Sequence, residues 1–146
     1  MKLNLALLLS LIGSGAVMAA PPTSPKELEL YHHCQDWLKN FPASYIATNI
    51  RGDGQQYAVR RQVALDMLRE RRDFGTVYEL MVNLDTGNFL SPQIIDILVE
   101  WKSRRAIPLL EQIAADKSRP KPLREKARTA AATLSALKPD HPPLFR

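Results

Sequence analysis

The chain has 146 residues, with 20 Lys and Arg against 15 Asp and Glu, a net charge of +5 and 45% hydrophobic residues. This length suits one domain that buries its own core. Cys34 is the only cysteine, which excludes an internal disulfide. The moderate positive charge is compatible with an acidic protein or an anionic envelope polymer as partner, and it is not specific for nucleic acid.

The N-terminal segment has the layout of a secretory signal peptide. Lys2 precedes an apolar stretch at 3–12 and small residues at 13–20, and we place cleavage after Ala19. A membrane anchor is the less favoured alternative, because the apolar stretch is shorter than the roughly 20 residues that a spanning helix needs. A signal peptide at 1–19 and a flexible lead-in at 20–25 predict a periplasmic or secreted protein without a membrane span.

The rest of the chain predicts an all-α fold, since no stretch shows sustained strand alternation. Ser24 before Pro25 and Ser91 before Pro92 are typical of an N-cap followed by proline in the first helical turn. The proline-rich tail at 139–146 is predicted to be extended. Seven helical segments, two of them short, are predicted within residues 26–41, 43–50, 55–72, 76–85, 93–103, 106–116 and 122–138.

Apolar spacing predicts which faces of the helices point inward. In the first helix the inward face is predicted to hold Leu30, Cys34, Trp37 and Phe41. In the third it is predicted to hold Val59, Val63, Met67 and Leu68. Trp101 lies one helical period from Ile94 and Leu98, which predicts a core position.

The helices also repeat. "TVYELMVNLD" and "IPLLEQIAAD" align through Asp85 and Asp116, 31 residues apart. "VRRQVALDML" and "LREKARTAAATL" align through Arg60 and Arg124, 64 residues apart, about two such periods. A period in the low thirties with two helices per unit is typical of an α-solenoid.

The last unit, with Pro108 early in one helix, Asp116 at its end and the next helix opened by Leu123, Arg124 and Ala127, resembles the HEAT-repeat family. The first unit matches through Asp53, Val59, Arg60 and Ala64, and the middle unit keeps only Asp85. The resemblance implies a HEAT-like helical domain at 26–138. Its expected form is a short right-handed stack of about three helix pairs with an extra N-terminal helix. The alternative is a non-repeating helical bundle.

The resemblance also implies a ladder of hydrogen bonds between the turns of successive units. Its expected members are Asp53, Arg60, Asp85 and Asp116, with Arg124 opposite Asp116. We interpret these residues as structural, because caps and paired charges are common where helices meet.

The first helix holds the residues that suit metal binding or nucleophilic chemistry. His32 and Asp36 lie one turn apart and could form half a metal site, but no further ligands follow at a suitable spacing. His33 points about 100° away from His32. Cys34 could act as a nucleophile or form an intermolecular disulfide, although burial beside Leu30 is favoured. We therefore predict no metal, no cofactor and no catalytic residues.

Charge is unevenly distributed along the chain. Residues 74–100 hold four acids and no base, whereas residues 101–138 hold ten bases and three acids. The simpler interpretation is that the basic residues form an ordinary solvated surface. The more specific interpretation is a docking patch for an acidic macromolecule, formed by Lys117, Arg119, Lys121, Arg124 and Arg128. Nucleic acid is not expected, because no aromatic residues alternate with these bases.

These features predict an exported, non-catalytic adaptor, assembly factor or inhibitor that binds an acidic protein partner. Two alternatives remain open: a metal-binding or enzymatic protein that uses the first helix, and a binder of an anionic envelope polymer.

Overall fold

The computed structural model describes residues 24–51 and 58–138, which are all-α and contain no strand. The predicted helices are present, and two short 3-10 helices join them. The elements are α1 (Pro25–Leu38), α2 (Ala43–Thr48), α3 (Ala58–Arg71), η3 (Phe74–Thr76), α4 (Val77–Asp85), α5 (Ser91–Glu100), η4 (Arg104–Ala106), α6 (Ile107–Ala115) and α7 (Lys121–Ala136). The predicted signal peptide at 1–19, most of the lead-in and the tail at 139–146 lie outside the described residues.

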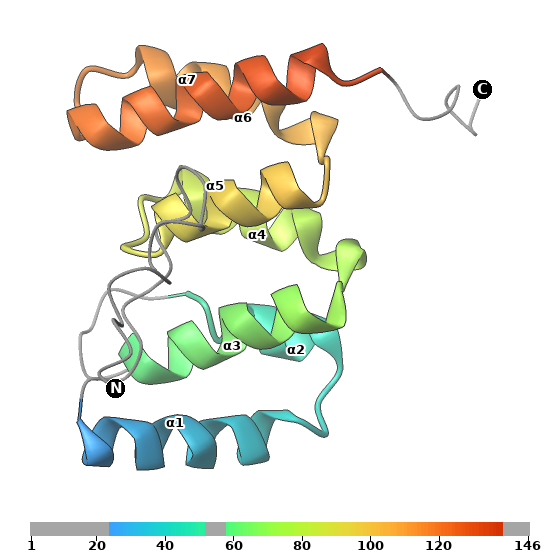
Figure 1. The fold of residues 1–146 in the computed structure, drawn as a ribbon, viewed down its shortest axis with the longest axis vertical. Coiled ribbons are helices and arrows are strands. Elements are labelled where there is room, and N and C mark those ends of the chain that lie inside the picture. Colours follow the sequence, from blue (N-terminus) through green and yellow to red (C-terminus); the bar gives the residue numbers. More distant parts are fainter. Residues whose placement is uncertain (1–23, 52–57, 139–146) are drawn as a thin grey trace, which may run out of the picture.

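The helices lie in pairs that are stacked along the longest axis of the molecule (Figure 1). α2 pairs with α3, α4 with α5 and α6 with α7, and α1 packs on α3 at one end of the stack. Between pairs, α4 contacts both α2 and α6, and α5 contacts α7. Each pair thus finds its packing partners in the neighbouring layers.

The two helices with a Ser-Pro sequence at their start begin differently. At α1 the Ser24 hydroxyl accepts from the Glu27 amide and the Glu27 carboxylate accepts from the Ser24 amide, both at 3.2 Å, which forms a capping box. The predicted cap at Ser24 is therefore confirmed. The predicted cap at Ser91 is wrong, because Ser91 is already helical and its hydroxyl donates to the Asn88 carbonyl. The Asn88 side-chain oxygen instead accepts from the Leu90 amide at 2.9 Å.

The turns that join one pair to the next share one backbone motif. Arg72 follows α3 and Lys102 follows α5, and both have left-handed backbone conformations, with φ of 54° and 53°. The next amide donates back to the helix, from Asp73 to the Leu68 carbonyl at 3.1 Å and from Ser103 to the Leu98 carbonyl at 2.9 Å. This is the Schellman arrangement, here built on basic residues instead of glycine. A 3-10 helix then leads into α4 or α6.

The matching turns fix the spacing between the two units at 30 residues. The predicted alignment of Asp85 with Asp116, 31 residues apart, is one residue out of register. Asp85 is the last residue of α4, whereas Asp116 follows α6 as its C-cap. Two aspartates at similar helix ends therefore occupy different structural positions.

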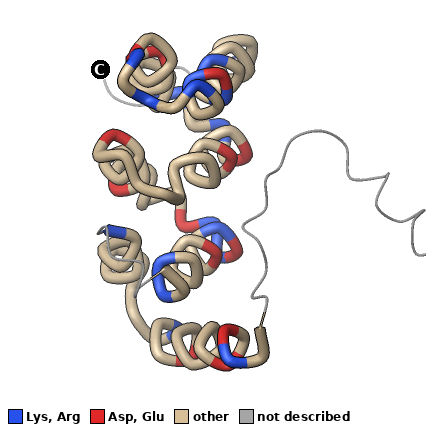
Figure 2. Tube along the Cα trace, turned by 90° about the vertical axis from the view of Figure 1, so that its left-hand side faces the viewer, with Lys and Arg blue, Asp and Glu red and all other residues tan. Residues whose placement is uncertain are grey.

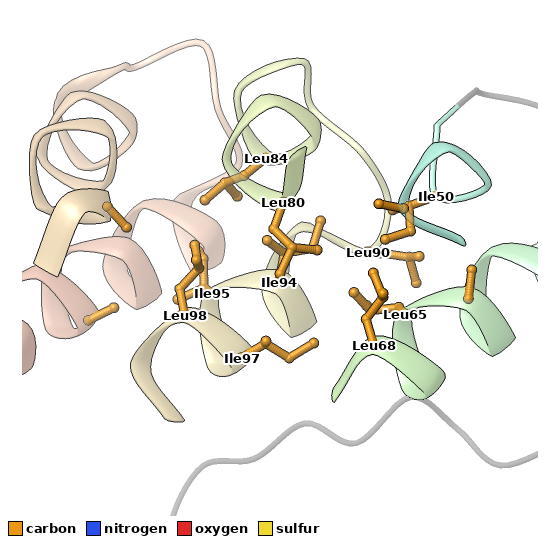
Figure 3. Packing of buried hydrophobic residues seen from close by; sticks show 14 of the residues in the cluster. Ile50, Leu65, Leu68, Leu80, Leu84, Leu90, Ile94, Ile95, Ile97 and Leu98 are labelled. Atoms are coloured by element: carbon orange, nitrogen blue, oxygen red, sulfur yellow. The ribbon is translucent and has the colours of Figure 1, made fainter. Parts of the chain in front are cut away.

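The core runs through the stack without a break (Figure 3). Leu80 and Leu84 of α4 point toward α5, and Ile94 and Leu98 of α5 meet them. All four are fully buried. The predicted inward face of α3 is also correct, since Val63, Met67 and Leu68 are buried and Val59 packs against the core from a half-buried position.

The predicted inward face of α1 is partly wrong. Cys34 is buried, but Leu30 is 45% exposed and Trp37 is 41% exposed. The reason is that α1 is the end helix and packs mainly on α3, so that only a narrow stripe of its surface is buried. Trp101, predicted to lie in the core, is half-buried, and its ring meets Phe74 edge-on at 5.2 Å between centroids.

A polar contact fixes α1 to α3. The Tyr31 hydroxyl donates to one oxygen of the Asp66 carboxylate at 2.9 Å, and the Gln62 amide donates to the other at 2.8 Å. Burial raises the pKa of the Asp66 carboxyl, and the bonds from Tyr31 and Gln62 offset this only in part. Burial beside Asp66 also raises the pKa of Tyr31 well above its usual range, so the phenol stays a donor.

The raised pKa of Asp66 predicts how stability depends on pH. Because the folded state favours the protonated carboxyl, its contribution is fully present below the unfolded pKa of about 3.9 and is lost as pH rises through the folded pKa. We expect the free energy of unfolding of the wild type, relative to Asp66→Asn, to fall between pH 3 and pH 7. Urea unfolding of both proteins at each pH measures this difference, and a difference that rises with pH would contradict the assignment.

Candidate partner-binding surfaces

The turn between α6 and α7 is held by the carboxylate of Asp116. One oxygen accepts from the Ser118 amide at 2.9 Å and from the Ser118 hydroxyl at 2.6 Å, and the other accepts from the Arg119 guanidinium at 3.3 Å. The bonds from Ser118, followed by those from Arg119, lower the pKa of Asp116. The turn is thus organised around one ionised carboxylate.

Arg119 links this turn to the preceding helix pair. Its guanidinium donates to the backbone carbonyl of Asp85, at the end of α4. It also lies against Gly87, where an added Cβ would stand 3.0 Å from the Arg119 Nη1 atom. The Arg119 side chain is only 21% exposed. Arg119, predicted to bind a partner, is therefore engaged within the protein, by Asp116 in its own turn and by the Asp85 carbonyl of the preceding pair.

The other four predicted partner-binding residues are not equivalent. Lys117 is exposed and makes no ion pair with a described residue. Lys121 is 77% exposed and stands 3.8 Å from Glu125. Arg128 is exposed and lines a recess of about 400 Å³ between α6 and α7. Arg124 is half-buried, and its Nε atom is buried without a hydrogen bond. Lys117, Lys121 and Arg128 thus form the outward part of this surface, which we call the terminal patch.

The residues expected to form a ladder of hydrogen bonds between turns make other contacts instead. Asp53 lies outside the described residues. Arg60 stands over the Trp37 ring, 5.9 Å from its centroid. Asp85 contributes its backbone carbonyl, and Asp116 pairs with Arg119 instead of Arg124. Among the described residues, Arg119 therefore makes the hydrogen bond that links the last two turns.

The acidic middle of the chain is partly neutralised by its neighbours. The α4–α5 pair carries acidic residues and no basic ones (Figure 2). Asp96 of α5 pairs with Lys126 of α7 at 2.6 Å, with both side chains 21% exposed. Glu100, at the end of α5, pairs with Arg69 of α3 at 2.6 Å. Two of the middle acids thus bind adjacent layers of the stack.

A second basic surface, which sequence reasoning missed, lies where one helix pair passes to the next. A recess of about 310 Å³ is lined by Phe74, Val77, Lys102, Ser103, Arg104 and Arg105. Exposed Arg72 belongs to the first of the two turns. We call these seven residues the inter-unit edge. The signal that could have found it is the 30-residue register, which aligns "RDFGT" (72–76) with "KSRRA" (102–106).

The first helix carries the residues considered for metal or nucleophilic chemistry. His32 and His33 are exposed, and the part of the chain that the structure describes contains no group of three potential metal ligands. The Asp36 carboxylate accepts a hydrogen bond from Lys39 at 3.0 Å, and this bond lowers the pKa of Asp36. Burial raises the pKa of the Cys34 thiol, which disfavours the thiolate needed of a nucleophile.

Comparisons of the chain with family models, with curated proteins and with solved structures return no match. Within residues 24–51 and 58–138, no helix has the length and apolar character needed to cross a membrane. Cys34 has no second cysteine with which to form an internal disulfide.

The contact between Arg119 and Gly87 can be tested by a double-mutant cycle. Gly87 has φ of +82°, so Gly87→Ala should strain the backbone and force the new Cβ against Arg119. We expect Gly87→Ala to lower the free energy of unfolding by about 2 kcal/mol. In an Arg119→Ala background the new Cβ no longer meets a guanidinium, so the same substitution should lower the free energy of unfolding by about 1 kcal/mol. Urea unfolding of the four proteins measures the coupling.

Gly75→Ala is the matched control, since no atom lies within 4 Å of a Cβ built there. Its expected effect is neutral or a stabilisation of about 0.5 kcal/mol. Equal losses for Gly87→Ala in both backgrounds would show that Arg119 does not occupy this position in solution.

Proposed function

We propose that this chain is an exported, non-catalytic protein-interaction module: an adaptor, assembly factor or inhibitor that acts in the periplasm or outside the cell. Its scaffold is a short, right-handed, HEAT-like stack of about three helix pairs, with α1 as the extra N-terminal helix. Its partner is a protein with an acidic surface.

The layered arrangement of the helix pairs supports the scaffold. Apolar residues are buried within a pair, as Leu80 of α4 and Ile94 of α5 are, and between pairs, as Ile97 of α5 is beside Leu68 of α3. The two inter-unit turns repeat the same hydrogen bonds after 30 residues. Such repetition supports a solenoid over a non-repeating bundle, because repeated units must join in the same way.

The observation that carries the functional proposal is an excess of cations without carboxylate partners on the last helix pair. Lys117 and Arg128 are exposed and form no ion pair with a described residue. Asp116, next to Lys117 in the sequence, pairs with Arg119, and Asp96 of α5 pairs with Lys126. Exposed charges of one sign accelerate encounter with an oppositely charged surface and orient it.

The test is cross-linked co-purification of the tagged chain from its native cell envelope, compared with a Lys117→Glu, Arg128→Glu variant. We expect a defined acidic protein to be recovered with the wild type and to be reduced about tenfold with the variant, which corresponds to a loss of about 1.4 kcal/mol in binding. Quantitative mass spectrometry of the cross-linked material measures the ratio.

The matched control is Lys26→Glu, Arg51→Glu, which reverses two exposed charges away from the terminal patch. It should retain the partner at the wild-type level. Equal loss with both variants would indicate a diffuse charge effect. Recovery of anionic polymer instead of protein, with binding abolished by moderate salt, would favour the envelope-polymer alternative.

A further inference from the structure

The recess of the inter-unit edge combines an apolar floor with a basic rim. Phe74 and Val77 come from the start of one helix pair, and Lys102, Arg104 and Arg105 come from the turn that starts the next. Phe74 is 55% exposed, yet its ring is held edge-on against Trp101. The volume of about 310 Å³ suits one large apolar side chain.

The cations at this edge have no carboxylate to neutralise them. Arg72, Lys102 and Arg105 are exposed, and none forms an ion pair with a described residue. Arg104 is directed to the Leu137 carbonyl at the end of α7. Among nearby acids, Glu100 is paired with Arg69 and Asp73 is half-buried. The rim is therefore positive, and no acid lines the recess.

The backbone places these cations at a regular spacing. Arg72 and Lys102 occupy the same position in successive Schellman turns. Packed helical layers are about 10 Å apart, and an extended peptide covers that distance in about three residues. Carboxylates three residues apart on an extended chain could therefore reach both positions.

We propose that the inter-unit edge binds an extended, acidic peptide segment of the protein partner, with one large apolar side chain inserted beside Phe74. This inference rests on the proposed function, because it names the part of the partner that is recognised. The apolar floor distinguishes such a peptide from a simple polyanion, which would use the rim alone. Both turns are held by backbone hydrogen bonds, which reduces the entropic cost of ordering the site on binding.

The first test is an NMR titration of the ¹⁵N-labelled full chain with a synthetic twelve-residue peptide of Gly, Ser and four Glu around one Phe. We expect the largest amide shifts within residues 72–77 and 101–106. One control peptide replaces Phe with Ala and another replaces each Glu with Gln. Both should bind at least about fivefold more weakly, since each removes one of the two recognised features.

Protein variants separate the edge from the terminal patch. Arg105→Glu and Phe74→Ala change exposed residues, so the fold, checked by circular dichroism, should be retained. Each should weaken peptide binding at least about fivefold. Arg128→Glu has the same charge change as Arg105→Glu but lies outside the edge, and it should alter the affinity by less than about twofold.

Several results would overturn the inference. One is no shift at millimolar peptide; another is shifts centred outside the two turns. A third is that inorganic polyphosphate binds the wild type as tightly as the peptide does, and binds Phe74→Ala with the same affinity as the wild type. That result would assign the edge to a polyanion. Loss of the co-purified partner in Lys117→Glu, Arg128→Glu but not in Phe74→Ala, Arg105→Glu would overturn the edge and leave the proposed function intact.

Discussion

The structure depends on one constraint: a single pair of short helices cannot bury its own apolar face. α4 and α6 have nine residues each, so the pairs are thin and each exposes apolar residues on two sides. Ile97 of α5, for example, is buried beside Leu68 of α3, which belongs to the neighbouring pair. Burying a large aliphatic side chain contributes about 1.5–3 kcal/mol, so stacking supplies most of the driving force.

Stacking also determines what happens at the ends of the helices. Passing from one layer to the next requires the chain to turn sharply after α3 and again after α5, and both turns use a left-handed basic residue. At the opposite ends of the pairs, the loops differ and a side chain makes the connection. Arg119 reaches from the last of these turns to the Asp85 carbonyl of the preceding pair. In the pair before it, the Asn88 amide likewise donates to the Ile50 carbonyl at 2.7 Å. One side of the stack is thus joined by backbone geometry and the other by side-chain hydrogen bonds to backbone carbonyls.

The sequence predicted the helices well, because amphipathic spacing and caps are local. Ser24 and Pro25 identified the start of α1, and the inward residues of α3 followed from helical periodicity. The exposure of Trp37 was not predictable in this way. Apolar spacing identifies the face that could be buried, whereas the number of neighbouring helices decides how much of it is buried. An end helix has fewer neighbours than its sequence suggests.

The candidate site was only partly predictable for a related reason. Sequence clustering placed Arg119 and Arg128 in one patch, but a flexible arginine can turn back to a carbonyl of the preceding layer, as Arg119 does. The register error had the same origin, since Asp85 and Asp116 look equivalent until their helix ends are compared. Which side chains remain available for a partner is decided by contacts across layers, and these are not local in sequence.

Helix pairs joined by matching turns bring residues that are distant in the sequence to one edge of the molecule. Residues that share a phase, such as Arg72 and Lys102, lie on one edge although 30 positions separate them. Residues adjacent in sequence, such as Ser118 and Arg119, can be consumed in holding a turn. Which exposed residues lie together on this protein therefore follows from the packing of the helix pairs and not from adjacency along the chain. Arg72 and Lys102, at equivalent turns, form no ion pair with a described residue, and Lys102 lines the same recess as exposed Phe74.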